Sequence, residues 1–295
     1  MRVNPYPITD LLAALNQTKL ATQQASTEVA TGRSVNVPSD NPTAAALLVE
    51  NNDQATFNAG YLQSLSAVQG QLSTADSTLS SVVTALQRAI SLGVEGGNGT
   101  LSDSDRASIV SELQGIQTQL ISLGNTSYEG RFIFAGTVSG TPPYAADHTA
   151  ASGVTYSGNG GVNQVSIGSG YKLAVNLPGS HLFSATGNDV FLAVNTLIQS
   201  LQTNTGIGDA VTQVSTASQF ISAQRVFYGN ASNQADSQTN YLDTAKLQIA
   251  QQENTLGGAD LATAATNLTQ AGIDTQATLA AISKLSQNNL FDYVK

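Results

Sequence analysis

Apolar residues near the start of the chain recur every three or four positions, the spacing that places side chains on one face of a helix. The stripe consists of Ile8, Leu11, Leu15, Thr18, Thr22, Ala25 and Val29. Gly32 is placed to end this helix, because glycine readily takes the left-handed conformation that follows helix C-termini. In the next segment, RSVNVPSDNP, Asn41 is placed as an N-cap with Pro42 in the first turn of another helix. We therefore expect a hinge between two helices.

The second helix is expected to run from about Pro42 to about Leu92, a length of roughly 70 Å. Its second half keeps a heptad pattern through Tyr61, Leu65, Val68, Leu72, Ala75, Leu79, Val82, Leu86 and Ala89. A helix of this length needs a partner along its whole apolar stripe.

The turn GVEGGNGT ends the second helix, and the residues from Ser102 to Asp105 resemble a capping box at the start of a third. The third helix carries Ile109, Leu113, Ile116, Leu120 and Leu123 before Gly124. The second and third helices are predicted to form an antiparallel hairpin.

From about Gly130 to Gly187 the pattern changes to frequent glycines and short runs of alternating polarity, which are typical of strands. The candidate strand residues are Phe132, Ile133 and Phe134; Val154 to Tyr156; and Val165 and Ile167, which face Leu173 and Val175 across the Gly168-Ser169-Gly170 turn. The pattern predicts a small antiparallel β domain inserted between two helical halves.

Helical patterning returns at about Asn188 and again after Gly208, and a last helical region runs from about Asn233 nearly to the end. One stripe in this last region consists of Leu242, Ala245, Ile249, Gln252 and Leu256. After Gly257-Gly258 a second stripe begins out of phase, with Leu261, Ala265, Leu268, Gly272, Thr275, Leu279 and Ile282. This break mirrors the N-terminal hinge, so the two ends of the chain are predicted to pair as weak amphipathic helices.

The predicted fold is mainly α with a small inserted β domain, in the form of a long antiparallel helical bundle or coiled coil with paired N- and C-terminal helices. Residues 1–41 and 257–295 are expected to form an inner domain of terminal helices. Residues 42–129 and 188–256 form a helical bundle domain, and residues 130–187 form the outer β domain.

The composition excludes several classes of function. Charged residues make up 11% of the 295 residues, against about a quarter in ordinary soluble domains. The net charge is −9 and the 11 basic residues are scattered, which argues against a nucleic-acid partner. Without Cys there is no disulfide, thiolate nucleophile or Cys metal site. No Sec signal peptide and no membrane span of about 20 apolar residues is recognisable, so we expect no membrane association.

The terminal stripes hold many Ala, Thr and Ser residues, so their burial yields about 10 to 20 kcal/mol before the ordering cost of about 1 to 2 kcal/mol per residue. We therefore hypothesise that the termini are polymerisation segments, which become ordered when neighbouring copies surround them. The residues chosen for packing between subunits are Ile8, Leu11, Leu15, Leu268, Leu279, Ile282, Leu290 and Phe291. The alternative is that they form the ordinary core of a monomer.

The two histidines, His148 and His181, fall in the β region without a nearby carboxylate cluster, so neither is assigned a metal or catalytic role. GSGYK at Gly168 to Lys172 lacks the spacing of a phosphate loop and fits a hairpin turn.

Asp103 and Asp105 lie where a helix N-terminus favours negative charge, which favours capping over catalysis. Arg131 is expected either to anchor the β domain on the helices through a salt bridge or to remain solvated. No catalytic, cofactor-binding or metal-binding residue is predicted, and the chain is not expected to be an enzyme.

The segment EVATGRSVNVPSDNPTAAALL resembles the N-terminal signature of the bacterial flagellin family, in which a helix ends at Thr-Gly-Arg and restarts after Pro-Ser-Asp-X-Pro. Four further stretches resemble the hook-filament junction branch of that family. They are GNGTLSDSDRASIVSEL; GNTSYEGRFIFAGT; the pair VTYSGNGG and VSIGSGYKLAVNLPG; and SKLSQNNLFDYVK.

The resemblance implies an extracellular structural subunit of the flagellum, exported uncleaved by the flagellar type III route with a chaperone at its C-terminal region. It also implies self-association in a ring, between a neighbouring hook-associated protein and the flagellin filament. The metalloprotease motif HExxH carried by some flagellins is absent.

Flagellin itself, the filament subunit, is the nearest alternative, and LFDYVK and FIFAGT favour the junction branch. A more remote alternative is a surface enzyme or glycan-binding module in the β insert. That alternative requires a pocket of converging polar groups, which the sequence does not reveal.

Overall fold

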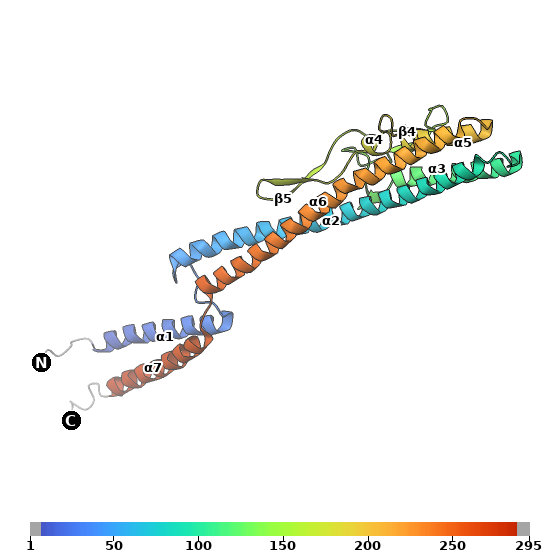
Figure 1. Ribbon diagram of the computed structural model, residues 1–295. Coiled ribbons are helices and arrows are strands. Elements are labelled where there is room, and N and C mark those ends of the chain that lie inside the picture. Colours follow the sequence, from blue (N-terminus) through green and yellow to red (C-terminus); the bar gives the residue numbers. More distant parts are fainter. Residues whose placement is uncertain (1–6, 288–295) are drawn as a thin grey trace, which may run out of the picture. The chain divides into compact units, whose positions relative to one another are not determined.

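The computed structural model describes residues 7–287 and is mainly helical (Figure 1). The helices are α1 (Pro7–Thr31), α2 (Pro42–Gly96), α3 (Asp103–Gly124), α4 (Gly179–Leu182), α5 (Val190–Thr203), α6 (Ile207–Gly257) and α7 (Leu261–Gln287). The strands are β1 (Ser127–Tyr128), β2 (Arg131–Phe132), β3 (Tyr144–Ala146), β4 (Val154–Tyr156), β5 (Gln164–Gly168) and β6 (Tyr171–Ala174). The predicted combination of long helices with a small β insert is confirmed.

The chain divides into two compact units. The terminal unit takes in the residues up to 57 and those from 244 onward, and the central unit takes in residues 58–243. The division into three domains that the sequence predicts remains a prediction.

The heptad of α2 forms the centre of the central unit, as predicted. Its residues from Leu65 to Leu92 are at most 3% exposed: Leu65, Val68, Leu72, Ala75, Leu79, Val82, Leu86, Ala89 and Leu92. The α6 residue Arg225 donates from Nε and Nη2 to the two carboxylate oxygens of Asp76 on α2, at 2.8 and 2.9 Å. Helix α6 is therefore a partner of α2, as the length of its apolar stripe requires.

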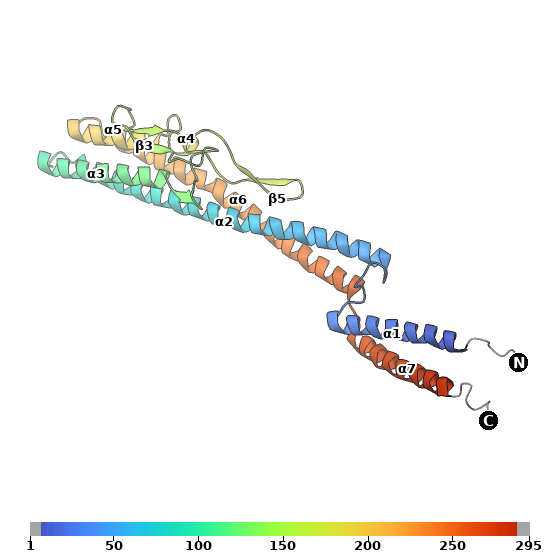
Figure 2. The same cartoon turned by 180° about the vertical axis from the view of Figure 1, so that it is seen from behind.

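The predicted hairpin of α2 and α3 is also present. Ser102 caps α3, accepting from the backbone N–H of Asp105 at 3.2 Å and donating to its carboxylate at 2.6 Å. Farther along the hairpin, Arg88 Nε donates to Glu112 at 2.7 Å. The two helices lie side by side in both views of the ribbon (Figures 1 and 2).

The expectation of a separate helical region beginning near Asn233 was wrong, because α6 runs without a break from Ile207 to Gly257. Gly229 lies inside this helix, where a glycine costs roughly 1 kcal/mol relative to alanine. Tyr228, Ala231 and Ala235 are all buried on either side of it. Packing of this face outweighs the local preference for a break.

The β segments form three separate antiparallel pairs, β1–β2, β3–β4 and β5–β6, within the described residues. The predicted pairing of Val165 with Leu173 is present in β5–β6. The strand predicted through Phe132, Ile133 and Phe134 ends at Phe132. Phe134 instead leaves the ladder, and its carbonyl accepts from Gly179 N at 2.7 Å and from the Tyr156 hydroxyl at 3.0 Å.

The inserted segments pack on the helices through an aromatic cluster rather than through a continuous sheet. The ring centroids of Phe134 and Phe183 are 5.2 Å apart in an edge-on arrangement, and Tyr144 lies 5.0 Å from Phe191 of α5. Burial raises the pKa of the Tyr144 hydroxyl far above its ordinary value. Short ladders are sufficient here because apolar burial, not strand pairing, fixes these segments.

Candidate subunit interface

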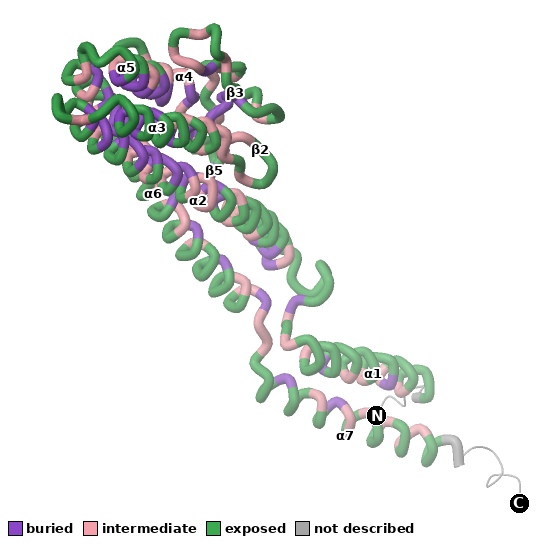
Figure 3. Tube along the Cα trace, turned by 90° about the vertical axis from the view of Figure 1, so that its right-hand side faces the viewer, coloured by how far each residue is buried: buried purple, intermediate pink, exposed green. Residues whose placement is uncertain are grey.

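The terminal helices α1 and α7 lie side by side (Figure 1). Their buried apolar residues are few and mostly small: Leu15, Ala25, Ala264 and Ala271 among the described residues. Between them the hydroxyls of Thr22 and Thr275 are 3.4 Å apart. Figure 3 shows both helices with long exposed stretches and isolated buried positions. The pair is therefore held by little apolar area.

The two breaks that the sequence predicts, at Gly32 and at Gly257-Gly258, lie against each other. Ser34 N donates to Gly257 O at 2.8 Å, and Ala259 N donates to Gly32 O at 2.9 Å. Arg33 and Gly258 form an antiparallel bridge between these bonds. We call this pair of segments, residues 32–34 and 257–259, the joint.

Side-chain oxygens fix the chain on either side of the joint. Asp40 accepts from the backbone N–H groups of Val37 at 3.0 Å and Asn36 at 2.9 Å, which holds the pKa of its carboxyl below the ordinary value. Asn41 Oδ1 accepts from Ala44 N at 3.1 Å, so Asn41 is the predicted cap. Asp260 accepts from the Thr263 hydroxyl and from the backbone N–H groups of Thr263 and Ala262, which lowers its pKa as well.

Exposed large apolar side chains are concentrated in the terminal unit, although this unit holds fewer than half of the residues. Those of its described residues are Ile8, Leu12, Leu20, Val29, Val37, Leu47, Val49, Phe57, Leu247, Leu261, Ile273, Leu279 and Leu285. Leu20 and Leu247 are each 66% exposed. Ion pairs in the described part of the chain, Arg88–Glu112 and Arg225–Asp76, lie in the central unit. The terminal unit thus presents a surface with many large apolar side chains, which is characteristic of interaction sites.

The predicted interface residues differ in how far they are exposed in the single chain. Ile8 is 41% and Leu279 48% exposed, whereas Leu15 is buried against the paired helix. Leu11, Leu268 and Ile282 are half-buried. Leu290 and Phe291 lie outside the described residues. The role of these side chains in contacts between subunits stays a prediction.

Sequence reasoning missed other exposed members of this surface, including Leu12, Leu20 and Ile273. They lie off the stripe that pairs α1 with α7, on faces that are otherwise polar. An isolated apolar residue on the polar face of an amphipathic helix was the available signal.

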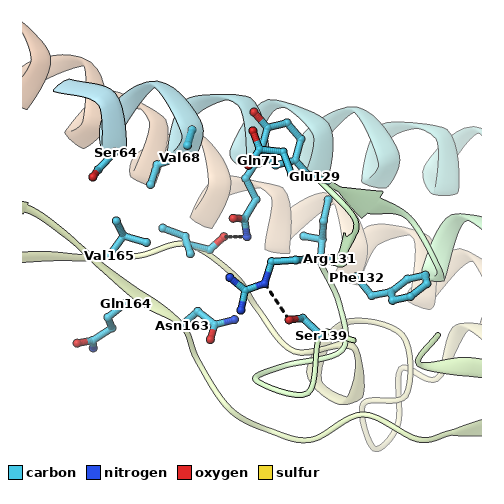
Figure 4. Close-up of a pocket in the computed structure, with 14 residues that line it drawn as sticks. Ser64, Val68, Gln71, Glu129, Arg131, Phe132, Ser139, Asn163, Gln164 and Val165 are labelled. Atoms are coloured by element: carbon cyan, nitrogen blue, oxygen red, sulfur yellow. Dashed lines mark hydrogen bonds between the residues drawn. The ribbon is translucent and has the colours of Figure 1, made fainter. Parts of the chain in front are cut away.

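A mixed polar and apolar cavity of about 380 Å³ lies in the central unit, between α2 and the β segments (Figure 4). Arg131 points into it and donates from Nε to Ser139 Oγ at 3.1 Å. Among the described residues it forms no ion pair with the helices, and it is exposed, which agrees with the solvated position of the two alternatives expected. We call this cavity the Arg131 pocket. The pocket thus brings together several polar side chains, among them Gln71, Arg131, Ser139 and Asn163. Such converging groups are what a binding module in the β insert requires, and the sequence did not reveal them.

The other candidate chemistry of the sequence shows no assembled site. His148 is exposed, and His181 lies 6.2 Å from the ring of Phe220. Across residues 7–287 no three metal-binding side chains gather, and no helix there is both long and apolar enough to cross a membrane.

The helical ends of the chain match two family descriptions. The bacterial flagellin N-terminal helical region matches residues 6–139, and the bacterial flagellin C-terminal helical region matches residues 205–294. Together they take in most of the chain, including both segments of the joint. The chain belongs to the bacterial flagellin family.

Two curated relatives are both named flagellar hook-associated protein 3. The chain is 35% identical over 190 residues to flagellar hook-associated protein 3 of Salmonella typhimurium and 39% identical over 121 residues to that of Escherichia coli. These matches cover 60% and 41% of this chain, and the chain spans 58% and 38% of the length of the two relatives.

Solved structures share the fold. A structure described as a flagellar hook-associated protein from Vibrio parahaemolyticus superimposes with a TM-score of 0.68 at 21% identity, covering 74% of this chain and all of that one. The flagellar junction protein FlgL from Legionella pneumophila gives a TM-score of 0.56 at 16% identity, covering 64% and 99%. These identities are low, so the likeness concerns the fold alone.

Proposed function

We propose that this chain is a structural subunit of the bacterial flagellum, a junction adaptor that joins the hook side to the flagellin filament by helix packing. The observation that carries the proposal is the apolar surface of the terminal unit. Its side chains are exposed in the single chain, on helices that bury little against each other. Association with neighbouring subunits removes such side chains from water, at about 25 cal/mol per Å² of apolar area.

The named relatives support the junction branch over the filament subunit. Both curated relatives carry the name flagellar hook-associated protein 3, and their matches exceed 30% identity. In this proposal the subunit works by surface complementarity, catalyses no reaction and uses no cofactor.

The proposed partners of the adaptor follow from its position between the hook side and the flagellin filament. It associates with copies of itself in a ring, with a neighbouring hook-associated protein on one side and with flagellin on the other. Before assembly an export chaperone covers its C-terminal region, and the chain reaches the extracellular flagellum by the flagellar export route.

In this proposal the predicted interface residues, together with Leu12, Leu20 and Ile273, pack against neighbouring subunits, except that Leu15 is already buried within the α1–α7 pair. The terminal helices then gain order on assembly, because burial within one α1–α7 pair supplies little free energy against the ordering cost. Hydrogen exchange of the dilute monomer should show weak protection of residues 8–30. Protection there as strong as in the heptad of α2 would contradict this part of the proposal.

Deletion of the gene tests the proposed function. We expect cells with hooks but without filaments, and flagellin monomers shed into the medium, both restored by the intact gene. Normal filaments in the deletion strain would contradict the junction role. Mixing the purified chain with filament seeds separates the two branches, because a filament subunit extends the seeds into long filaments and a junction adaptor does not.

A further inference from the structure

The Arg131 pocket holds a cation with unused hydrogen-bonding capacity. The Nε of Arg131 bonds Ser139, and neither terminal nitrogen has a hydrogen-bond partner among the described residues. Glu129 lines the same pocket, yet it forms no ion pair with Arg131. In Figure 4 the guanidinium lies near the middle of the pocket, with Gln71, Asn163 and Ser139 around it.

The walls around Arg131 are fixed by bonds outside the pocket. Ser139 O accepts from Phe132 N at 2.9 Å, which ties the loop that bears the Ser139 hydroxyl. Asn163 N donates to Asn176 Oδ1 at 2.6 Å, and its side-chain amide donates to Gly136 O at 2.9 Å. Asn176 is fully buried. A ligand would therefore meet a largely preformed site, with a small ordering cost on binding.

The helix side of the pocket is shaped by Gly70 and Tyr128. The Tyr128 hydroxyl lies where a Cβ on Gly70 would stand, so α2 accommodates this ring only because residue 70 is glycine. Tyr128 and Phe132 line the pocket together with Val68 and Val165. The walls of the pocket thus include apolar and aromatic side chains.

These groups match one class of ligand. Two free terminal nitrogens of a planar guanidinium fit the two oxygens of a carboxylate. The acceptor oxygens of Gln71 and Asn163, and the hydroxyl of Ser64, suit ligand hydroxyl groups, while the aromatic rings suit the C–H faces of a sugar. The volume lies in the range of small-molecule sites. We propose that the Arg131 pocket binds an acidic sugar of about one residue, with its carboxylate on Arg131.

This proposal goes beyond the junction role and stands independently of it. The pocket belongs to the central unit, whereas the surface assigned to assembly belongs to the terminal unit. Loss of sugar binding would leave the attachment of filaments unchanged, so the two proposals fail separately.

Titration of the full chain with glucuronate, followed by nuclear magnetic resonance and calorimetry, tests the site. We expect saturable binding that shifts the Arg131 Nε–H and the Gln71 and Asn163 amide signals. Acetate should bind at least about tenfold more weakly and glucose should not bind, because each lacks one half of the recognised chemistry. Arg131→Gln should weaken glucuronate binding at least about tenfold.

Lys172→Gln is the matched control, because it removes an exposed positive charge from β6 outside the pocket. It should leave glucuronate binding unchanged, and circular dichroism should show both variants folded. Absence of saturable glucuronate binding would overturn the proposal, as would equal affinity for acetate or unchanged binding by Arg131→Gln. Loss of self-association by Arg131→Gln without any glucuronate binding would overturn it in favour of an acidic side chain from a neighbouring subunit.

Discussion

Arg106 Nη1 donates to the side-chain oxygen of Asn204 at 2.7 Å, from a residue that is only 7% exposed. The same nitrogen donates to Gly96 O at 3.1 Å, and Nη2 donates to Leu101 O at 3.4 Å. Asn204 is the C-cap of α5 in the left-handed conformation, and Gly96 ends α2. This buried cation therefore lies at two helix C-termini, where unpaired carbonyls carry partial negative charge. It bonds the Gly96 carbonyl of α2 directly and reaches α5 through the side chain of its C-cap, Asn204.

Arg106→Met should lower the free energy of unfolding by about 3 kcal/mol, because it removes charge-assisted bonds and leaves buried carbonyls without donors. Arg88→Met on the neighbouring helix is the control, since it breaks an exposed ion pair and should cost less than about 1 kcal/mol. Urea unfolding monitored by circular dichroism measures both. Equal losses for the two variants would show that Arg106 contributes nothing beyond an ordinary surface pair.

The joint depends on Gly32, whose φ is +67° and whose surroundings leave open space where a side chain would begin. Gly32→Ala should therefore weaken the joint by about 1 to 2 kcal/mol through backbone strain alone. Gly60→Ala, inside α2 and also in open space, should instead stabilise its helix by about 0.5 to 1 kcal/mol. Exchange rates of the Ser34 and Ala259 amide hydrogens, which form the bonds of the joint, should rise only in Gly32→Ala.

Acid should loosen the segments beside the joint. Backbone bonds from Val37 and Asn36 lower the pKa of Asp40, and bonds from Thr263 and Ala262 lower that of Asp260. A carboxyl with a lowered folded pKa stabilises the fold above its unfolded pKa, near 3.8, and loses this contribution as the pH falls through the folded value. The protection of the Val37 and Thr263 amide hydrogens against exchange should thus decrease once the pH is lowered under about 3.8. Asp40→Asn should remove the effect at Val37 and leave it at Thr263.

Replacing a core leucine and replacing a surface leucine should lower the free energy of unfolding of the monomer by very different amounts. Leu79→Ala, at a fully buried heptad position, should cost about 2 to 5 kcal/mol, because it leaves a cavity between packed helices. Leu247→Ala, at a position 66% exposed, should change the free energy of unfolding of the monomer by less than about 0.5 kcal/mol. Thermal and urea unfolding measure the two costs. A large loss for Leu247→Ala would mean that the monomer itself buries this side chain.

Local and periodic features of this fold were predictable from the sequence. The heptad of α2, the caps at Asn41 and Ser102 and the breaks at Gly32 and Gly257-Gly258 depend on residues within a few turns of one another. Features that depend on residues far apart in the sequence could not be predicted. The continuity of α6 across Gly229 comes from tertiary packing, and the burial of Arg106 depends on Asn204, almost a hundred positions away.

The candidate surface was predictable only in part for the same reason. Periodicity finds the stripe by which α1 faces α7, and this stripe includes Leu15, which is buried in the single chain. It does not find Leu20 or Ile273, which lie on the opposite faces and remain exposed. The Arg131 pocket was invisible because its walls come from residues 64–71 of α2 and from strands and loops between residues 128 and 175, far along the chain.

The central claim is that exposed apolar side chains of the terminal helices bind neighbouring subunits and contribute little to the monomer. The most direct measurement compares the double variant Leu20→Ser, Ile273→Ser with the unchanged chain, in urea unfolding of the monomer and in filament counts of complemented deletion cells. We expect a monomer stability within about 0.5 kcal/mol of the original, together with hooks that hold few or no filaments. Unchanged filament numbers would contradict the claim, as would a loss of filaments that merely follows unfolding of the monomer.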